Sequence, residues 1–152
     1  MADINDMARQ AGEVEKAIGK AANIIKVEGL QFIHDNFDKQ GFESAPGKVN
    51  KWQPRKVSTN KKKAKKEAKS SRSILVNKGN LRRTWDTETN VKGQKVVFQN
   101  SLPYAQVHNE GGKAGRGTGF RMPQREMIGE SAELDARIES KIDKLMDAIL
   151  GS

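Results

Sequence analysis

The sequence has no cysteine, few aromatic residues and no long hydrophobic run. The absence of cysteine excludes disulfide bonds, thiolate metal sites and a cysteine nucleophile. No apolar stretch approaches the ~20 residues that a membrane-spanning helix needs, and residues 1–10 lack the basic start and apolar block of a signal peptide. We therefore expect a soluble protein that has no membrane partner and is made and used in a cytoplasm.

The chain is long enough for one domain with its own hydrophobic core, but short for two. It has 152 residues, of which 35% are hydrophobic and 31% are charged. This lean composition predicts a small core together with segments that lie outside it. We expect a single domain over residues 1–150.

The positive charge is concentrated in the middle of the chain. The formal net charge is +9; residues 39–83 carry +13, whereas residues 1–38 carry −3 and residues 84–152 carry −1. Self-repulsion and low hydrophobicity oppose core packing, so we expect residues 40–72 to form a long, flexible basic loop. The basic arm within it comprises Lys61, Lys62, Lys63, Lys65, Lys66 and Lys69.

Two interpretations of this loop stay open. It is either a solvated surface loop or an arm that contacts nucleic acid or an acidic partner surface. Only one aromatic residue, Trp52, is interleaved with its charges, whereas a stacking platform for single strands needs more. Contacts between lysine and duplex phosphates need no aromatic residue. A nucleic-acid-binding module that uses residues 48–83 is therefore the alternative function.

Residues 1–38 have the hydrophobic period of a long amphipathic helix. The apolar stripe, with spacings of three and four interrupted at Glu28, consists of Met7, Ala11, Val14, Ile18, Ala21, Ile25 and Phe32. Asp3, Asn5 and Asp6 are candidate N-caps, and Gly41 is a candidate stop. Such a stripe is typical of a coiled-coil seam or of a helix that lies across a sheet, and we favour the helix across a sheet.

Short strands are expected in residues 74–112, the predicted sheet region. Residues 80–85 predict a helical turn. The alternating residues 84–91 and the apolar residues 95–99 predict an antiparallel hairpin around the linker 92–94.

The end of the chain predicts a loop and a helix. Residues 113–122 form a glycine-rich loop, and an apolar stripe predicts a helix over residues 131–150 with Ser131 as its N-cap. The predicted fold is α+β, with a long N-terminal helix and a C-terminal helix packed on a small antiparallel sheet, and with a long basic loop.

Candidate catalytic and metal-binding groups are few. His34 and His108 have no metal-ligand partner at helical i, i+4 spacing, so we expect structural or hydrogen-bonding roles for both. Asp86 and Glu88 alternate along a predicted strand and would face one side, as in a metal-dependent nuclease, but a solvent-facing pair is the favoured interpretation. The glycines complete neither phosphate-binding pattern. The sequence predicts no catalytic residue, no metal and no cofactor.

Three segments together resemble the bacteriophage virion morphogenesis family, also described as tail completion proteins. They are residues 52–54 with 74–84, residues 102–112, and residues 122–129. Their order is similar to the family's W-x-P, I-L-x-x-x-G-x-L-x-x-S/T, Y-A-x-x-H-x-x-G-G and closing P-x-R motifs. The residues carrying the resemblance that we take as candidates for assembly contacts are Tyr104, His108, Gly111, Gly112, Pro123, Arg125 and Gly129.

The resemblance implies a structural protein of the virion and not an enzyme. Its expected role is tail completion or head–tail joining, as a neck or tail terminator component assembled in the cytoplasm of the bacterial host. The implied partners are the tail tube, the connector or the neck, together with further copies in a homo-oligomeric ring, for which a hexamer follows from the tail symmetry of the family. A basic arm could also contact packaged DNA.

Roles for single residues follow from the motifs. Arg125 is a candidate for a fork-like pair with a carboxylate, within or between subunits, or for a local salt bridge. Tyr104 and His108 lie one turn apart if residues 104–108 are helical, and we expect them to pack the sheet against the following loop.

Overall fold

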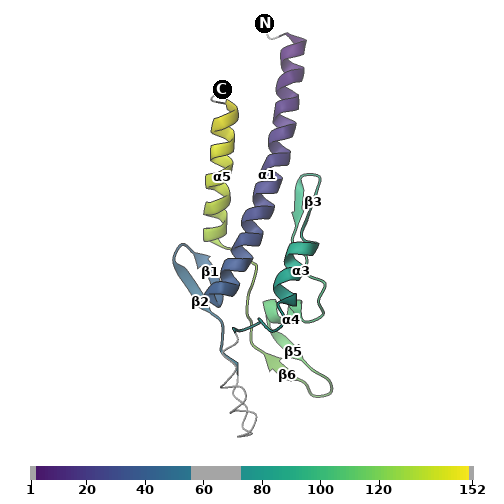
Figure 1. Ribbon diagram of the computed structural model, residues 1–152, viewed down its shortest axis with the longest axis vertical. Coiled ribbons are helices and arrows are strands. Elements are labelled where there is room, and N and C mark those ends of the chain that lie inside the picture. Colours follow the sequence, from purple (N-terminus) through teal and green to yellow (C-terminus); the bar gives the residue numbers. More distant parts are fainter. Residues whose placement is uncertain (1–2, 56–72, 151–152) are drawn as a thin grey trace.

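Two helices of unequal length run side by side, with two small hairpins beside the C-terminal half of the longer helix and a third beyond its end (Figure 1). The computed structural model describes residues 3–55 and 73–150. The helices are α1 (Ile4–Lys39), α3 (Asn80–Glu88), α4 (Ala105–Glu110) and α5 (Ala132–Leu150). The strands are β1 (Gly41–Ala45), β2 (Lys48–Lys51), β3 (Asn90–Lys92), β4 (Lys95–Val97), β5 (Gly112–Ala114) and β6 (Phe120–Met122).

The predicted α+β class is confirmed. The strands pair as β1–β2, β3–β4 and β5–β6, and each pair is a separate antiparallel sheet of two strands. In place of the one sheet expected beneath α1, the helix packs on α5 and α3 and contacts β1, β3 and β4 of two separate hairpins. A two-stranded hairpin is marginal by itself in water, so each depends on the helices for its stability.

Helix α1 is confirmed over its predicted span. Asp3 occupies the N-cap, although its side chain makes no capping hydrogen bond. The helix ends because Gln40 adopts a left-handed conformation with φ 53°, and its N–H bonds back to the carbonyl of Phe37 at 3.3 Å. Gly41, the predicted stop, is instead the first residue of β1. A side chain there would overlap the opposite strand, 2.7 Å from the carbonyl oxygen of Asn50.

Helix α5 is joined to α1 by an arginine-centred network. Arg137 Nη1 lies 2.6 Å from Asp35 Oδ2 on α1, and its Nε lies 2.5 Å from Glu133 Oε1 one turn back. The guanidinium carbon also lies 5.9 Å from the ring centroid of Phe32, within the range of a cation–π interaction. These contacts hold α5 antiparallel to the C-terminal half of α1.

The strand β1 is fixed on both sides through Glu43. The buried Asn36 accepts a hydrogen bond from the Glu43 N–H at 3.0 Å and donates one to the carbonyl of Met127 at 3.1 Å. Ser131 donates to the Glu43 carbonyl at 2.6 Å and accepts from the Leu134 N–H at 3.3 Å. The predicted N-cap Ser131 is thereby confirmed, and the same hydroxyl anchors α5 to β1.

The start of the predicted basic loop is not a loop. Residues 41–51 form the β1–β2 hairpin, in which Phe42 pairs with Asn50 and the turn contains Gly47 with φ 72°. Pro46 and Gly47 form the turn between the two strands, which is a common use of this dipeptide. The expectation of a loop over residues 40–72 is therefore wrong for residues 41–51. The lysines of the basic arm lie outside the described residues.

The region predicted as sheet contains two helices. Residues 84–88, predicted to belong to a strand, are part of α3, where Leu81 and Trp85 are buried at helical i, i+4 spacing. The Thr84 hydroxyl bonds to the Asn80 carbonyl one turn back at 2.9 Å, so threonine fits the helix in spite of its strand preference. The hairpin around residues 92–94 is confirmed as β3–β4, with Val91 opposite Val96.

The glycine-rich segment is largely a hairpin instead of the expected loop. Residues 112–114 and 120–122 pair as β5–β6, with Lys113 opposite Arg121. Gly115, Gly117 and Gly119 have positive φ in the connection between the strands. Glycine adopts this conformation at little steric cost, so these glycines allow the tight connection between β5 and β6.

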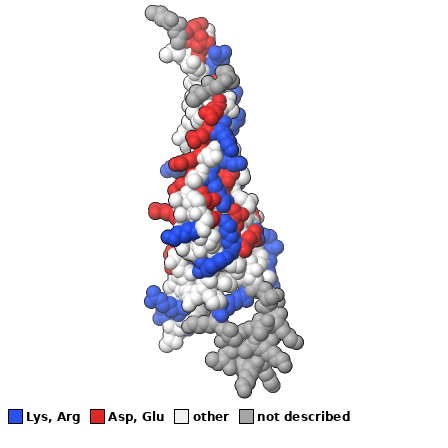
Figure 2. All heavy atoms as spheres, turned by 90° about the vertical axis from the view of Figure 1, so that its left-hand side faces the viewer, with Lys and Arg blue, Asp and Glu red and all other residues white. Residues whose placement is uncertain are grey.

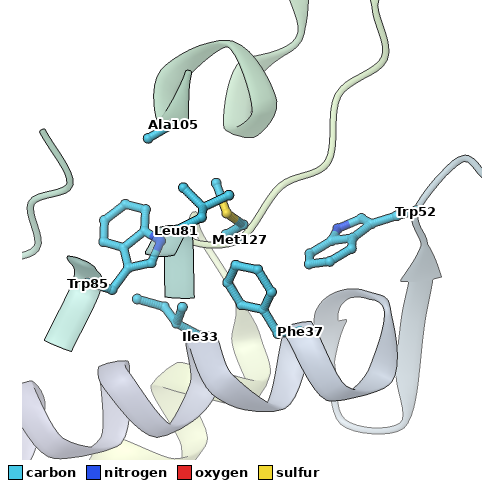
Figure 3. Packing of buried hydrophobic residues seen from close by; sticks show 7 residues of the cluster. All are labelled: Ile33, Phe37, Trp52, Leu81, Trp85, Ala105 and Met127. Atoms are coloured by element: carbon cyan, nitrogen blue, oxygen red, sulfur yellow. The ribbon is translucent and has the colours of Figure 1, made fainter. Parts of the chain in front are cut away.

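The hydrophobic core gathers residues from α3, α4 and two connecting segments onto the last turns of α1 (Figure 3). Its buried members are Ile33, Phe37, Trp52, Leu81, Trp85, Ala105 and Met127. Phe37 and Trp52 pack edge to face, with ring centroids 5.5 Å apart. Burial of each large side chain contributes about 1.5–3 kcal/mol, so this cluster holds α1, α3, α4 and the segment around Met127 together.

Candidate functional site

The three segments that resemble the family motifs meet in space at one end of the molecule. We call this assembly the motif cluster and define it by Trp52, Gln53, His108, Asn109, Arg125 and Met127. The segment after β2 contributes the first two residues, α4 contributes the next two, and the stretch between β6 and α5 contributes the last two. They are widely separated in sequence, so only the fold brings them together.

Trp52 and Arg125 join the first motif to the last. The indole Nε1 of Trp52 donates to the carbonyl of Glu126 at 2.9 Å. In the opposite direction, Nε and Nη2 of Arg125 both donate to the carbonyl of Gln53 at 3.1 Å. The W-x-P segment and the P-x-R segment are therefore locked to each other by reciprocal hydrogen bonds between side chain and backbone.

Arg125 forms no ion pair with a carboxylate of its own chain among the described residues, and a pair between subunits stays a prediction. Its side chain is buried, and its guanidinium donates two hydrogen bonds to a carbonyl oxygen instead of a carboxylate. Burial and the neighbouring charge of Arg55 lower the pKa of Arg125 below its ordinary value, yet arginine stays protonated in proteins. Its positive charge is not neutralised by a carboxylate among the described residues.

Asn109 joins the second motif to the last and was missed by the sequence reasoning. Its Oδ1 accepts from the N–H groups of Met127 at 2.8 Å and Ile128 at 3.2 Å, and its Nδ2 donates to the carbonyl of Ile128 at 3.2 Å. The Arg125 N–H also donates to the carbonyl of His108 at 2.7 Å. An asparagine inside a helix is intrinsically unfavourable, and that was the available signal for a special role.

The glycines of the motifs have different roles. Gly111 follows α4 with φ 75°, and a side chain there would come within 3.0 Å of the Gln124 backbone nitrogen. Gly129 would bring a side chain into overlap with the carboxylate of Glu126. Gly112 begins β5, and Pro123 follows β6 on the rim of a shallow depression that it shares with Gly111 and Gly112. These predicted residues thus lie beside the motif cluster.

Next to the motif cluster is a cavity of about 750 Å³, which we call the cationic cavity. Among the residues that line it are three cations and three aromatic groups: Arg55, Lys78, Arg125, Tyr104, His108 and Phe120. No Asp or Glu is found among its described lining residues. Tyr104 and Phe120 are both exposed, so the cavity presents apolar rings beside fixed positive charge.

Tyr104 and His108 form an edge-to-face pair one helical turn apart. Residues 105–110 are helical, and the two ring centroids lie 6.1 Å apart. Burial, with the charge of Arg125 as a second cause, lowers the pKa of His108 below its ordinary value of 6.5, so the ring is predominantly neutral at pH 7. Its Nδ1 is buried and has no hydrogen-bond partner within the described part of the chain.

The second histidine belongs to a separate polar link between α1 and α3. His34 Nε2 lies 2.6 Å from Asp86 Oδ1, and Arg82 Nε donates to His34 Nδ1 at 2.5 Å. Arg82 also pairs with Asp38 at 2.8 Å. Because Nδ1 accepts from Arg82, the neutral ring carries its proton on Nε2 and donates to Asp86. The hydrogen-bonding role predicted for His34 is thus confirmed.

The possible carboxylate pair of Asp86 and Glu88 is not formed. Both residues lie on α3, where a separation of two positions directs side chains to different sides of a helix. Asp86 contacts His34, whereas Glu88 accepts from the N–H and hydroxyl of Ser101, both at 2.5 Å. Within residues 3–55 and 73–150, no three His, Asp or Glu side chains gather as a metal site. No helix in these ranges is long and apolar enough to span a membrane.

Comparison with protein-family models places this α+β chain among the structural proteins of bacteriophages. The chain belongs to the phage virion morphogenesis family, whose model matches residues 6–147 and so covers nearly the whole chain. This is a structural family that is not known to be enzymatic, and it connects the protein with the virion. No significant match was found among curated proteins or solved structures.

Proposed function

We propose that this protein completes the phage tail or joins it to the head, acting as a neck or tail terminator component. The observation that carries the proposal is the meeting of all three family-like motifs beside the cationic cavity. The backbone hydrogen bonds of the motif cluster give this surface a fixed shape, which lowers the entropic cost of docking a partner. The proposed partners are the tail tube, the connector or other neck proteins.

The chemistry of the cationic cavity supports an acidic partner surface. Arg55, Lys78 and Arg125 supply positive charge, and Tyr104 and Phe120 supply exposed aromatic area. Aromatic residues and arginine are enriched at protein interfaces and carry much of their binding energy. A carboxylate-bearing loop of a connector or tube subunit would satisfy both features.

The first experiment is complementation of particles from the parent phage or prophage that lacks this gene. We expect separate filled heads and tails, which purified protein joins into infectious particles. The variant Tyr104→Ala with Phe120→Asp should fail to join them. The control is Val27→Asp, since Val27 is 61% exposed on α1, close to the 58% of Phe120. Normal infectious particles without the gene would overturn the proposal.

The alternative function is nucleic-acid binding through residues 48–83. The described part of this segment supports it to the extent that Arg55 and Lys78 line the cationic cavity. If it is the main function, deletion of residues 61–69 should abolish activity, and affinity for duplex DNA should fall steeply with salt because bound counterions are released. If assembly is the function, substitutions in the motif cluster should reduce activity more than the loss of these lysines does.

A further inference from the structure

The N-terminal half of α1 carries an apolar stripe that the described part of the chain leaves exposed. The exposed fractions are 81% for Ile4, 60% for Met7, 57% for Val14 and 39% for Ile18, whereas Phe32 on the same series is 0% exposed. Exposure therefore falls steadily from the free end of the helix toward the core. In Figure 1 this end of α1 extends beyond the C-terminal end of α5.

The stripe continues a seam that the fold already uses. Its positions alternate by three and four residues and include Ala11 between Met7 and Val14, which is the spacing of a helix–helix contact. Further along the same series, Phe32 packs on Phe42 of β1 with ring centroids 5.6 Å apart and lies under Arg137 of α5. The exposed half of α1 thus has the apolar spacing of a helix face that packs on a neighbour, but no described residues cover it.

A helical segment of this composition gains little stability from its own backbone. Gly12 and Gly19 lie within it, and each costs about 1 kcal/mol relative to alanine. Most helical stability in proteins comes from packing of an amphipathic face. Residues 3–11 make up more than two turns, and each of them is exposed, so their order depends on a surface that covers the stripe.

The charge of residues 3–20 indicates which kind of partner surface can cover the stripe. Residues 3–20 carry four acidic and three basic side chains, interleaved along the helix. Figure 2 shows the same mixture of signs along the helical part of the molecule. A phosphate backbone or a surface of one sign would favour a segment of the opposite sign, whereas two copies of a nearly neutral segment with mixed charges meet without net repulsion.

We propose that the N-terminal half of α1 is a self-association surface, in which the stripe from Ile4 to Ile18 packs on the same stripe of a second copy of this chain. The inference goes beyond the proposed function, which names other virion proteins as partners, and adds a contact between two copies of this chain. Helix-to-helix packing at this spacing would bury the four most exposed residues of the stripe.

The first test measures self-association of the full chain by sedimentation velocity across a range of protein concentrations. Val14→Asp should raise the dissociation constant at least about tenfold, equivalent to 1.4 kcal/mol. Val27→Asp is the matched control, because it makes the same change on the same helix at 61% exposure outside the stripe, and it should associate like the wild type. Circular dichroism should show the same folded core in both variants.

The second test uses the absence of cysteine. Ala11 is central in the stripe, so a cysteine there faces its copy whether two helices pair parallel or antiparallel. Ala11→Cys should therefore form disulfide-linked dimers under mild oxidation. Arg9→Cys should not, since two residues turn about 200° around a helix.

Three results would overturn the inference: a monomeric wild type, equal association of the two aspartate variants, or equal crosslinking of the two cysteine variants. A monomeric wild type that still joins heads to tails would remove this interface and leave the joining role intact. A Val14→Asp protein that no longer self-associates but still joins them would establish the interface and separate it from joining.

Discussion

The guanidinium of Arg125 holds the carbonyl oxygen of Gln53 with two hydrogen bonds of 3.1 Å across 72 residues of sequence. Arg125, the charged residue of the P-x-R motif, thus uses two of its hydrogen-bond donors to bind the backbone of its own chain. Its remaining charge lies at the wall of the cationic cavity. One side chain thereby fixes the W-x-P segment and sets the sign of the neighbouring surface.

Replacement of Arg125 by lysine should destabilise the fold although the charge is kept. An ammonium group is a point donor and cannot reproduce the two-donor fork, so we expect a loss of about 1–3 kcal/mol in the free energy of unfolding. Urea denaturation measures it. Arg121→Lys on the exposed strand β6 is the control and should be neutral. Equal midpoints for both variants would show that the fork is not needed.

Asn109→Leu should be more damaging than its position in a short helix suggests. The change removes the acceptor of two backbone N–H groups and the donor to a third backbone group. Unsatisfied buried groups cost about 1–3 kcal/mol each, so we expect a lower thermal midpoint and loss of joining activity. Asn23→Ala on the exposed side of α1 should lower neither, because alanine favours the helix. A wild-type melting curve for Asn109→Leu would show that the hydrogen bonds from this amide to the backbone of Met127 and Ile128 do not stabilise the fold.

Two glycines of α1 should respond in opposite directions to alanine. At Gly29 a methyl group would overlap the Phe98 ring, whereas at Gly19 nothing lies within 4 Å. Gly29→Ala should lose about 1–3 kcal/mol through overpacking, while Gly19→Ala should gain roughly 0.5–1 kcal/mol from helix propensity. Chemical denaturation of the two variants side by side is the measurement. A gain at both positions would mean that Phe98 moves away freely.

Acid should weaken the β1 region through Glu43. The hydrogen bond from Lys39 is the main reason that the pKa of Glu43 lies below its ordinary value of 4.5. Burial raises this pKa, but the hydrogen bond and charge of Lys39, the Gly47 N–H and the charge of Arg137 together outweigh burial. Because the folded carboxylate binds a proton more weakly than the unfolded one, its stabilisation is complete above 4.5 and is lost as pH falls through the lower folded pKa. Unfolding free energies measured from pH 7 downward should therefore fall in this range.

Glu43→Gln provides the comparison for the pH series. The amide cannot titrate, so the variant should be less stable than the wild type at neutral pH and should converge with it in acid. Parallel curves for the two proteins would assign the acid sensitivity to other carboxylates, for example Asp35, whose pKa is also lowered.

Local sequence patterns determined the parts of the fold that depend on near neighbours. The period of apolar residues located α1 and α5, Ser131 marked the start of α5, and the linker 92–94 located the β3–β4 hairpin. Each of these signals acts within a few residues, because helices and tight turns close their hydrogen bonds locally. The ordered motifs likewise indicated the family from the sequence alone, and the family comparison confirmed it.

Tertiary structure decided what the distant partners are. Residues 84–88 alternate like a strand but are helical, because burial of Leu81 and Trp85 on one face favours α3. Arg125 found a carbonyl oxygen, and Asn36 and Asn109 found backbone groups far along the chain. Most buried polar groups are satisfied by whatever packing brings near them, and sequence spacing does not encode that neighbour. The apolar stripe of α1 is a further example. Its residues are spaced by three and four in both halves of the helix, but only the fold decides which half is covered.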